Sequence, residues 1–286
     1  MNGIRAFLLL LVAALTALLG GCAQPARDAV RFGLPAAPVT LDPRYATDAT
    51  STRLNRLLYA RLVDFDARMR PVPALASWRR LGPRHYRFEL GEANRVFHDG
   101  SALDAADVVA TYDHVLDPAN GSPHRGSLEH LERVRAVGPD TVDFHLSRPD
   151  PLFPGRLVIG IVPARFAGAR EALAEDPVGS GAFAFVAWPR EDRLELRRID
   201  DGQRFEFMRV PDPTVRVLKL LRGELDLVQG EIPPELIAWV DGRRDLVVLR
   251  ARGSNFTYLG FNLEDPVVGR KEVRLAVAHA LDRQAL

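Results

Sequence analysis

Strand-like and helix-like patterns interleave irregularly along this chain, and proline and glycine residues separate them. A short apolar run at 30–34 and alternating apolar and charged residues at 86–90 predict strands, because every second side chain of a half-buried strand faces the core. Apolar residues at helical spacing predict helices over 48–60 and 271–281. Strands and helices mixed in this way indicate an α/β fold with mixed sheets.

Asp104 marks the clearest helix start. Its carboxylate can accept hydrogen bonds from the first backbone amides, and Asp107 lies in the first turn, where a negative charge favours the positive end of a helix. This helix should end at about Leu116, before Asp117-Pro118. Proline is favoured at the first helical position, so Asp212-Pro213 predicts a second start. The apolar side of that second helix should consist of Val217, Leu218 and Leu221.

Turn residues separate the remaining predicted strands. Gly138-Pro139-Asp140 predicts a hairpin formed by 131–137 and 141–146. A continuous apolar run at 157–162 predicts a buried strand. Further strands are predicted on both sides of Glu191-Asp192 and at 225–228, 246–249 and 256–261.

The N-terminus predicts export and lipid attachment. An apolar stretch at 6–19 is too short to span a bilayer and is typical of a signal peptide. Small residues then precede Cys22, the only cysteine, and residues 19–22 resemble the lipobox of a bacterial lipoprotein. The alternative, a buried cysteine on a core helix, is disfavoured by Pro25 and the charges that follow it. We therefore expect a periplasmic or extracytoplasmic protein, anchored to the membrane through a lipid on Cys22.

Composition and charge argue against several classes of function. A net charge of +1 suggests no nucleic-acid partner. The seven histidines show no metal-ligand spacing, His124 and His130 being the nearest pair, and no thiol remains beyond Cys22. Ser180 stands between two glycines, but the pattern lacks one residue of a nucleophile elbow. The sequence thus predicts no catalytic residues, no metal site and no cofactor.

Seven phrases of the sequence, in order, match one known family. They are residues 40–43, 73–78, 97–100 with 106–109, 177–183, 223–226, 261–262 and 273–283. Together they resemble the family 5 solute-binding proteins of bacterial ABC importers, which are peptide, oligopeptide and nickel receptors. Two departures from the family pattern are Ala182, where proline is usual, and residues 200–203, which replace a characteristic phrase.

Some of these phrases also have a purely structural interpretation. His98 lies in a turn that Gly100 permits, and a hydrogen-bonded histidine is favoured there over a ligand-binding one. The glycines of 179–181 could bring the backbone close to a ligand or simply form a turn, and both interpretations stay open. For Tyr258, an ordinary strand residue packed in the core is favoured over a ligand contact.

The resemblance implies a periplasmic-binding-protein-like fold of type II, cluster C, in which two lobes close over a ligand. The chain ends within or just after the first helix of the second lobe, so we expect a C-terminally truncated member with that lobe largely missing. The helix from Lys271 should then expose Val273, Ala276, Val277 and Ala280. The expected domains are a signal peptide (1–21), a lipid-anchored linker (22–29), the first-lobe core (30–48 and 155–262), an inserted subdomain (49–154) and the start of the second lobe (263–286).

The function that the resemblance implies is extracytoplasmic solute binding for an ABC importer. The expected partners are a peptide or similar small polar solute, and an ABC permease with its ATPase subunits; the protein is expected to be a monomer. The alternative is a non-transport envelope lipoprotein or decayed gene fragment that acts as a protein-interaction module. Nickel binding would need histidines from the second lobe. The candidate ligand-binding residues are Val39 and Thr40 after the first strand, Ser180 in the glycine turn, and Tyr258 with Asn262.

Overall fold

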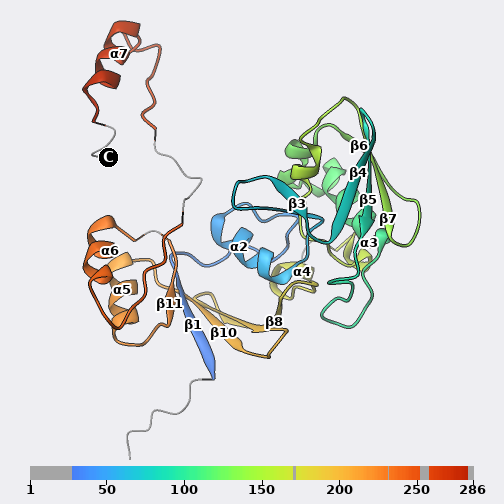
Figure 1. Ribbon diagram of the computed structural model, residues 1–286, viewed down its shortest axis with the longest axis horizontal. Helices are drawn as coiled ribbons and strands as arrows, with labels where there is room; N and C mark the ends of the chain where they lie inside the picture. Colours follow the sequence, from blue (N-terminus) through green and yellow to red (C-terminus); the bar gives the residue numbers. More distant parts are fainter. Residues whose placement is uncertain (1–27, 170–171, 231, 252–257, 283–286) are drawn as a thin grey trace, which may run out of the picture. The chain divides into compact units, whose positions relative to one another are not determined.

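The computed structural model describes residues 28–169, 172–230, 232–251 and 258–282 (Figure 1). The chain divides into two compact units, with the boundary in the sequence between Leu236 and Ile237, and each unit is described by itself. Within the described residues, no helix is long and apolar enough to cross a membrane. Cys22 and the predicted signal peptide lie outside the described residues.

A mixed five-stranded sheet forms one part of the first unit. Its strands follow the order β11-β1-β10-β9-β8. The pairs of β1 with β10 and with β11 are parallel, whereas β10 with β9 and β9 with β8 are antiparallel. The predicted mixed sheet is thus confirmed. The strands are β1 (Ala29–Leu34), β8 (Phe183–Arg190), β9 (Arg193–Arg198), β10 (Arg204–Arg209) and β11 (Leu227–Val228).

Helix α2 (Ala49–Leu58) packs on this sheet near β8. Asp48 caps the helix by accepting a hydrogen bond of 2.9 Å from the backbone amide of Ser51. Leu54 and Leu58 are buried in one cluster with Leu194, Leu196 and Phe207 of the sheet. The predicted helix over 48–60 is therefore confirmed.

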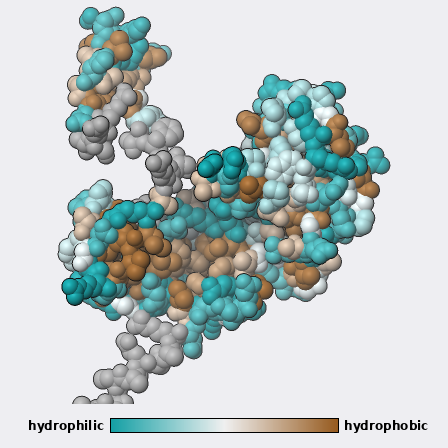
Figure 2. Space-filling model, viewed as in Figure 1, coloured by the Kyte–Doolittle hydropathy of each residue, from teal (hydrophilic) through white to brown (hydrophobic). Residues whose placement is uncertain are grey.

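Helix α5 (Pro213–Leu221) begins as predicted, with Asp212 accepting a 2.8 Å hydrogen bond from the amide of Val215. Its predicted apolar side is only partly right, because Val217 is buried but Leu218 is 38% exposed. Arg216 is buried instead, and its guanidinium donates to the carbonyls of Val210 and Pro211. Figure 2 shows apolar surface in the region of α5.

A second, antiparallel sheet lies within residues 76–146 and has the strand order β4-β5-β7-β6. Helix α3 (Ala105–Leu116) packs against β6 and β7. Asp104 caps its start as predicted, by accepting a 2.7 Å bond from the amide of Ala106. Asp107 in turn accepts a 2.9 Å bond from the amide of Asp104, which completes a capping box that was not predicted. The predicted hairpin and the strand at 86–90 are confirmed. The strands are β4 (Ala76–Gly82), β5 (His85–Leu90), β6 (Leu131–Ala136) and β7 (Thr141–Leu146), beside a small hairpin of β2 (Val63–Phe65) and β3 (Pro71–Pro73).

Four predicted strands are wrong in whole or in part. Residues 157–162 are largely buried, but they form only one bridge, between Arg61 and Gly160, and the amide of Ile161 donates to the carbonyl of Ala60. The segment 246–249 forms no strand; Val247 is 84% exposed. Residues 258–261, the described part of the last predicted strand, form none either. The strand predicted at 225–228 is reduced to β11.

Helix α7 and several short helices complete the described residues. Helix α7 (Lys271–Ala280) has no buried residue; Ala276 and Ala280 are exposed and Val273 and Val277 half-buried, in keeping with the predicted exposed face. The remaining helices are α4 (Ala172–Glu175), α6 (Pro234–Asp241) and the 3-10 helices η2 (Pro118–Asn120), η3 (Pro123–Leu128), η4 (Phe153–Arg156) and η5 (Ala164–Phe166).

Two hydrophobic clusters divide the first unit's core. One contains the four-stranded sheet and α3, and the other contains α2 and the five-stranded sheet. Along the chain, the buried residues up to Tyr59 belong to the cluster of α2, those from Ala60 to Ile161 belong to the cluster of α3, and those from Val162 on belong again to the cluster of α2. The predicted domain boundaries at 49 and 154 remain a prediction, and this packing favours moving them to about 60 and 161.

Candidate functional site

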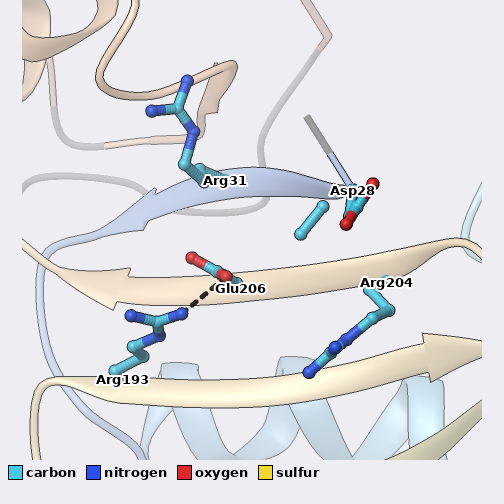
Figure 3. A pocket seen from close by; sticks show the side chains of 6 residues that line it. Asp28, Arg31, Arg193, Arg204 and Glu206 are labelled. Atoms are coloured by element: carbon cyan, nitrogen blue, oxygen red, sulfur yellow. Dashed lines mark hydrogen bonds and ion pairs between the residues drawn. The ribbon is translucent and has the colours of Figure 1, made fainter. Parts of the chain in front are cut away.

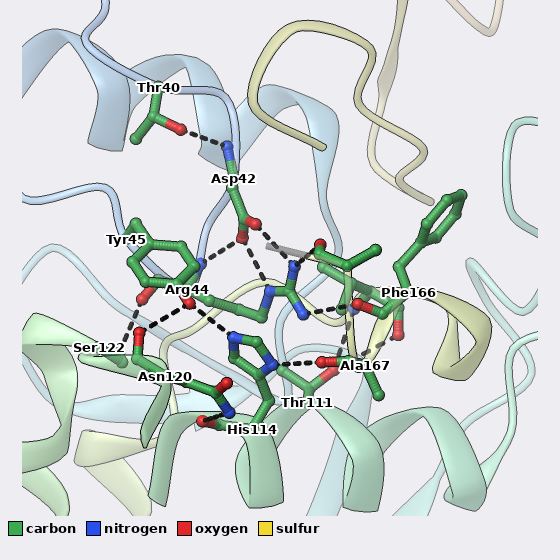
Figure 4. A network of polar contacts seen from close by, with 12 residues as sticks. Thr40, Asp42, Arg44, Tyr45, Thr111, His114, Asn120, Ser122, Phe166 and Ala167 are labelled. Atoms are coloured by element: carbon green, nitrogen blue, oxygen red, sulfur yellow. Dashed lines mark hydrogen bonds and ion pairs between the residues drawn. The ribbon is translucent and has the colours of Figure 1, made fainter. Parts of the chain in front are cut away.

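The loop after β1 is held in place by a buried ion pair. Asp42 and Arg44 are both fully buried (Figure 4). Arg44 donates from Nε to Asp42 Oδ1 at 2.9 Å and from Nη2 to Oδ2 at 2.7 Å. Its other donor positions reach the carbonyls of Phe166 at 2.9 Å and Ala169 at 3.1 Å. One guanidinium therefore joins the loop after β1 to residues 166–169.

A second group of polar contacts extends this network to α3. Tyr45 Oη lies 2.8 Å from His114 Nε2 and 3.0 Å from the carbonyl of Asn120. His114 Nδ1 contacts the carbonyl of Ala167, so Nδ1 carries the proton. Burial, and then the charge of Arg44, lower the pKa of His114 and favour its neutral form. The loop after β1 is thereby fixed on two sides (Figure 4).

The same loop borders a groove of about 710 Å³, which we call the β8 groove. Val39, which is 79% exposed, lies on its rim. The amides of Val39 and Thr40 donate to Ser51 Oγ at 2.8 and 3.2 Å, so the start of α2 holds the rim in position. The residues that line the groove are Ala36, Ala37, Pro38, Val39, Glu175, Phe185, Trp188, Arg190, Glu191 and Arg209.

The β8 groove combines aromatic surface with charges of both signs. Phe185 and Trp188 of β8 are half-buried. Arg190 is paired with Asp192 through bonds of 2.9 and 2.8 Å. In the part of the chain that the structure describes, Arg209 and Glu175 form no ion pair. The groove can therefore offer apolar contact, a cation and an anion to one ligand.

The glycine turn at 179–181 is explained by close packing against the end of α2. A Cβ atom on Gly179 would lie 1.9 Å from the carbonyl oxygen of Leu58, and one on Gly181 would lie 2.3 Å from that of Leu57. The amide of Gly181 donates to Leu58 O at 2.8 Å. These contacts favour a turn that packs on the end of α2 over a turn that brings the backbone close to a ligand.

His98 completes this contact. Its backbone amide donates to the carbonyl of Gly179 at 2.8 Å, and its Nε2 lies 3.0 Å from the carbonyl of Gly181. Burial lowers the pKa of His98, in keeping with a neutral ring that donates to a carbonyl. The prediction of a hydrogen-bonded rather than ligand-binding histidine agrees with these contacts.

The five predicted ligand-binding residues have different surroundings. Val39 lines the β8 groove, whereas the hydroxyl of Thr40 accepts a 3.1 Å bond from the amide of Asp42 within its own loop. Ser180 is 3% exposed, and its Oγ has no hydrogen-bond partner among the described residues. Tyr258, 79% exposed, and Asn262, whose Oδ1 accepts from the amide of Glu264, belong to the second unit. Their role in binding stays a prediction.

The groove residues of β8 and β10 were not predicted. Phe185 and Trp188 lie in a strand that the sequence does predict, and of the residues that line the groove only Val39 was predicted to bind a ligand. Arg209 ends β10, a strand that the sequence analysis did not identify. The alternation of Phe205 and Phe207 with charged residues was the available signal.

A second hollow, of about 380 Å³, lies beside the start of β1 (Figure 3). It is lined mainly by charged side chains, and its three arginines already form ion pairs. Arg193 contacts Glu206 at 2.6 Å, and Arg204 contacts Glu195 at 2.5 Å. Arg31 is paired with Asp226 at 3.1 Å. These pairs leave little charge for a ligand, so the β8 groove is the better candidate.

Comparisons with known proteins agree on one family. A family profile described as "Bacterial extracellular solute-binding proteins, family 5 Middle" matches residues 70–286. Protein XP55 of Streptomyces lividans is 32% identical over 91% of this chain and 49% of its own length. The oligopeptide-binding protein AppA of Bacillus subtilis is 26% identical over 87% of this chain and 49% of its own length.

Solved structures give the same result for the fold. NikZ from Campylobacter jejuni, in complex with Ni(L-His), superposes with a TM-score of 0.78 at 24% identity, over 91% of this chain and 54% of that one. The periplasmic binding protein DppA from Helicobacter pylori, in complex with the peptide STSA, gives 0.76 at 24% identity, over 90% and 57%. The predicted periplasmic-binding-protein-like fold is confirmed. The chain spans about half the length of the relatives it matches.

Proposed function

We propose that this chain, which belongs to the family 5 bacterial extracellular solute-binding proteins, is the solute-binding component of an ABC importer. Its solutes would be peptides or similar small polar molecules, taken up outside the cytoplasm. It would act as a monomer and deliver them to an ABC permease with its ATPase subunits. Two relatives support this class of solute, since AppA is an oligopeptide-binding protein and DppA was solved with a bound peptide.

The observation that carries the proposal is the chemistry of the β8 groove. A peptide presents a carboxylate, an ammonium group and apolar side chains, and the groove offers Arg209, Glu175 and Trp188 to match them. Strand β8 is also the outermost strand of its sheet, so one of its edges can pair with an extended peptide. Backbone pairing of this kind holds peptides of varied sequence, while the pockets beside it select side chains.

Calorimetric titration of the full chain with di- to pentapeptides tests the groove. We expect binding that Trp188→Ala weakens by about thirtyfold, because truncating an aromatic anchor in a binding pocket costs about 2 kcal/mol. Arg209→Ala should weaken binding of peptides with a free C-terminus more than that of amidated peptides. The control is Arg135→Ala, an exposed arginine of β6 outside the groove. Absence of peptide binding, or equal affinity in all variants, would contradict the proposal.

We also propose that Cys22 carries the lipid anchor. Two or three acyl chains provide a stable membrane signal, whereas one chain gives only reversible binding. In cells fed labelled palmitate, the chain should take up label, and Cys22→Ser should abolish both labelling and recovery in the membrane fraction. Ala23→Ser, one position later, should leave both unchanged. Labelling of the Cys22→Ser variant at the level of the unaltered chain would rule out this anchor.

A further inference from the structure

Two histidines and an aspartate meet on one face of the four-stranded sheet. His85 of β5 and His145 of β7 are directly opposite each other in the strand register. Their rings stack with centroids 4.3 Å apart and an interplanar angle of 24°. Asp143 lies two residues before His145, so both side chains point to the same face. One ligand atom from each of the three residues lies within 4.8 Å of the others.

The contacts within the cluster leave room for a metal ion. His85 Nε2 lies 3.1 Å from Asp143 Oδ2, yet it is screened from solvent and forms no hydrogen bond with good geometry. Arg87 donates to both oxygens of Asp143 at 2.7 and 2.8 Å. Each carboxylate oxygen still has a lone pair, since a carboxylate accepts about four hydrogen bonds.

A ligand can reach the two histidines from outside. Both line a hollow of about 690 Å³, together with Arg84, Glu132 and Arg133. The positive charges of Arg84 and Arg133 oppose the binding of a cation beside them, so we expect a moderate affinity for a ligand that is a metal ion.

We propose that His85, Asp143 and His145 bind a divalent transition-metal ion of the Zn²⁺ type. Two imidazoles and one carboxylate are the ligands that such ions favour, whereas Mg²⁺ and Ca²⁺ prefer oxygen alone. Three protein ligands leave a position open on the side of the hollow, as at zinc sites that exchange their fourth ligand. Arg87 would act from outside, by orienting the carboxylate.

The geometry requires only a small adjustment. Ligand atoms at about 2.1 Å from a tetrahedral ion lie about 3.4 Å apart, so the farthest pair in this cluster has to close by no more than about 1.4 Å. Small rotations of the two half-exposed imidazoles can supply this movement. The β8 groove contributes no residue to the cluster, so the metal site does not depend on the proposed function.

Titration of the full chain, without an affinity tag that contains histidine, tests the proposal. With ZnCl₂ we expect one binding site that His85→Gln, His145→Gln and the double variant weaken by more than about tenfold, since even outer contacts to a metal contribute 10- to 100-fold. His279→Gln, on an exposed helix of the other unit, is the matched control. Circular dichroism confirms that each variant is folded.

Bound Cu²⁺ provides a second readout that a purely structural role would not change. Its electron paramagnetic resonance spectrum should show coupling to two imidazole nitrogens in the unaltered chain, and each single histidine variant should lose one. Equal Zn²⁺ affinity in the chain and the double variant would overturn the proposal. So would a loss in His279→Gln as large as in His85→Gln. Both measurements are made without peptide, so a failure here leaves the proposed function standing.

Discussion

Asp42→Ala should lower the free energy of unfolding by about 3–5 kcal/mol, as expected when one partner of a buried ion pair is removed. The remaining guanidinium of Arg44 is fully buried and would keep its carbonyl partners but lose its counter-charge. Asp42 also accepts the amide of Arg44, so the turn itself would loosen. Urea unfolding followed by circular dichroism measures the change.

An exposed ion pair provides the control for this result. Arg70 and Asp66 lie 2.7 Å apart, but the arginine side chain is 68% exposed, so Arg70→Ala should cost less than about 1 kcal/mol. Asp42→Asn should fall between the two, because it keeps an acceptor for Arg44 while removing the charge. An unfolding free energy of Asp42→Ala within 1 kcal/mol of the unaltered chain would show that water or rearrangement compensates the buried guanidinium.

The elements that sequence analysis predicted well are those with local determinants. The capping box of Asp104 and Asp107 involves atoms three residues apart, and the hairpin around Gly138 needs only its own turn. The segment 157–162 shows the limit of this approach. Its apolar residues are buried as expected, but its backbone contacts residues 60 and 61, far away in the sequence, through a single bridge rather than a strand ladder.

Strand β10 is the opposite case, a strand that forms although the sequence analysis did not predict it. It pairs with β1 in parallel and with β9, so its position in the sheet depends on β1, a segment far away in the sequence. Its sequence contains three charged residues among six, which hides the alternation of Phe205 and Phe207. Only the partners of a strand decide whether such a short alternating segment is paired.

The candidate sites depend even more on distant pairing. Val39 could be predicted from its place after the first strand, but Trp188 and Arg209 reach the same groove through separate strands. The histidines of the proposed metal site are far apart in the sequence, and the spacing that normally indicates a metal site is absent. Their approach follows from the register of β5 with β7, which places His85 opposite His145.

Gly179→Ala should lower the free energy of unfolding by about 3 kcal/mol or more, at the upper end of what overpacking costs. The new Cβ would lie 1.9 Å from the carbonyl oxygen and 2.7 Å from the carbonyl carbon of Leu58, and backbone atoms cannot rotate away as a side chain can. To make room, the end of α2 has to separate from the turn. That movement would break the 2.8 Å bonds from Gly181 to Leu58 and from His98 to Gly179. Thermal and urea unfolding measure the loss.

The same substitution at Gly126 separates close packing from a general effect of alanine. No heavy atom lies within 4 Å of a Cβ built on Gly126, and its backbone conformation suits an L-residue, so Gly126→Ala should change stability by less than about 1 kcal/mol. If Gly179→Ala were as stable as Gly126→Ala but lost peptide binding, the turn would serve ligand approach after all. Loss of stability in Gly179→Ala would instead assign the glycines to the junction between α2 and the turn at His98.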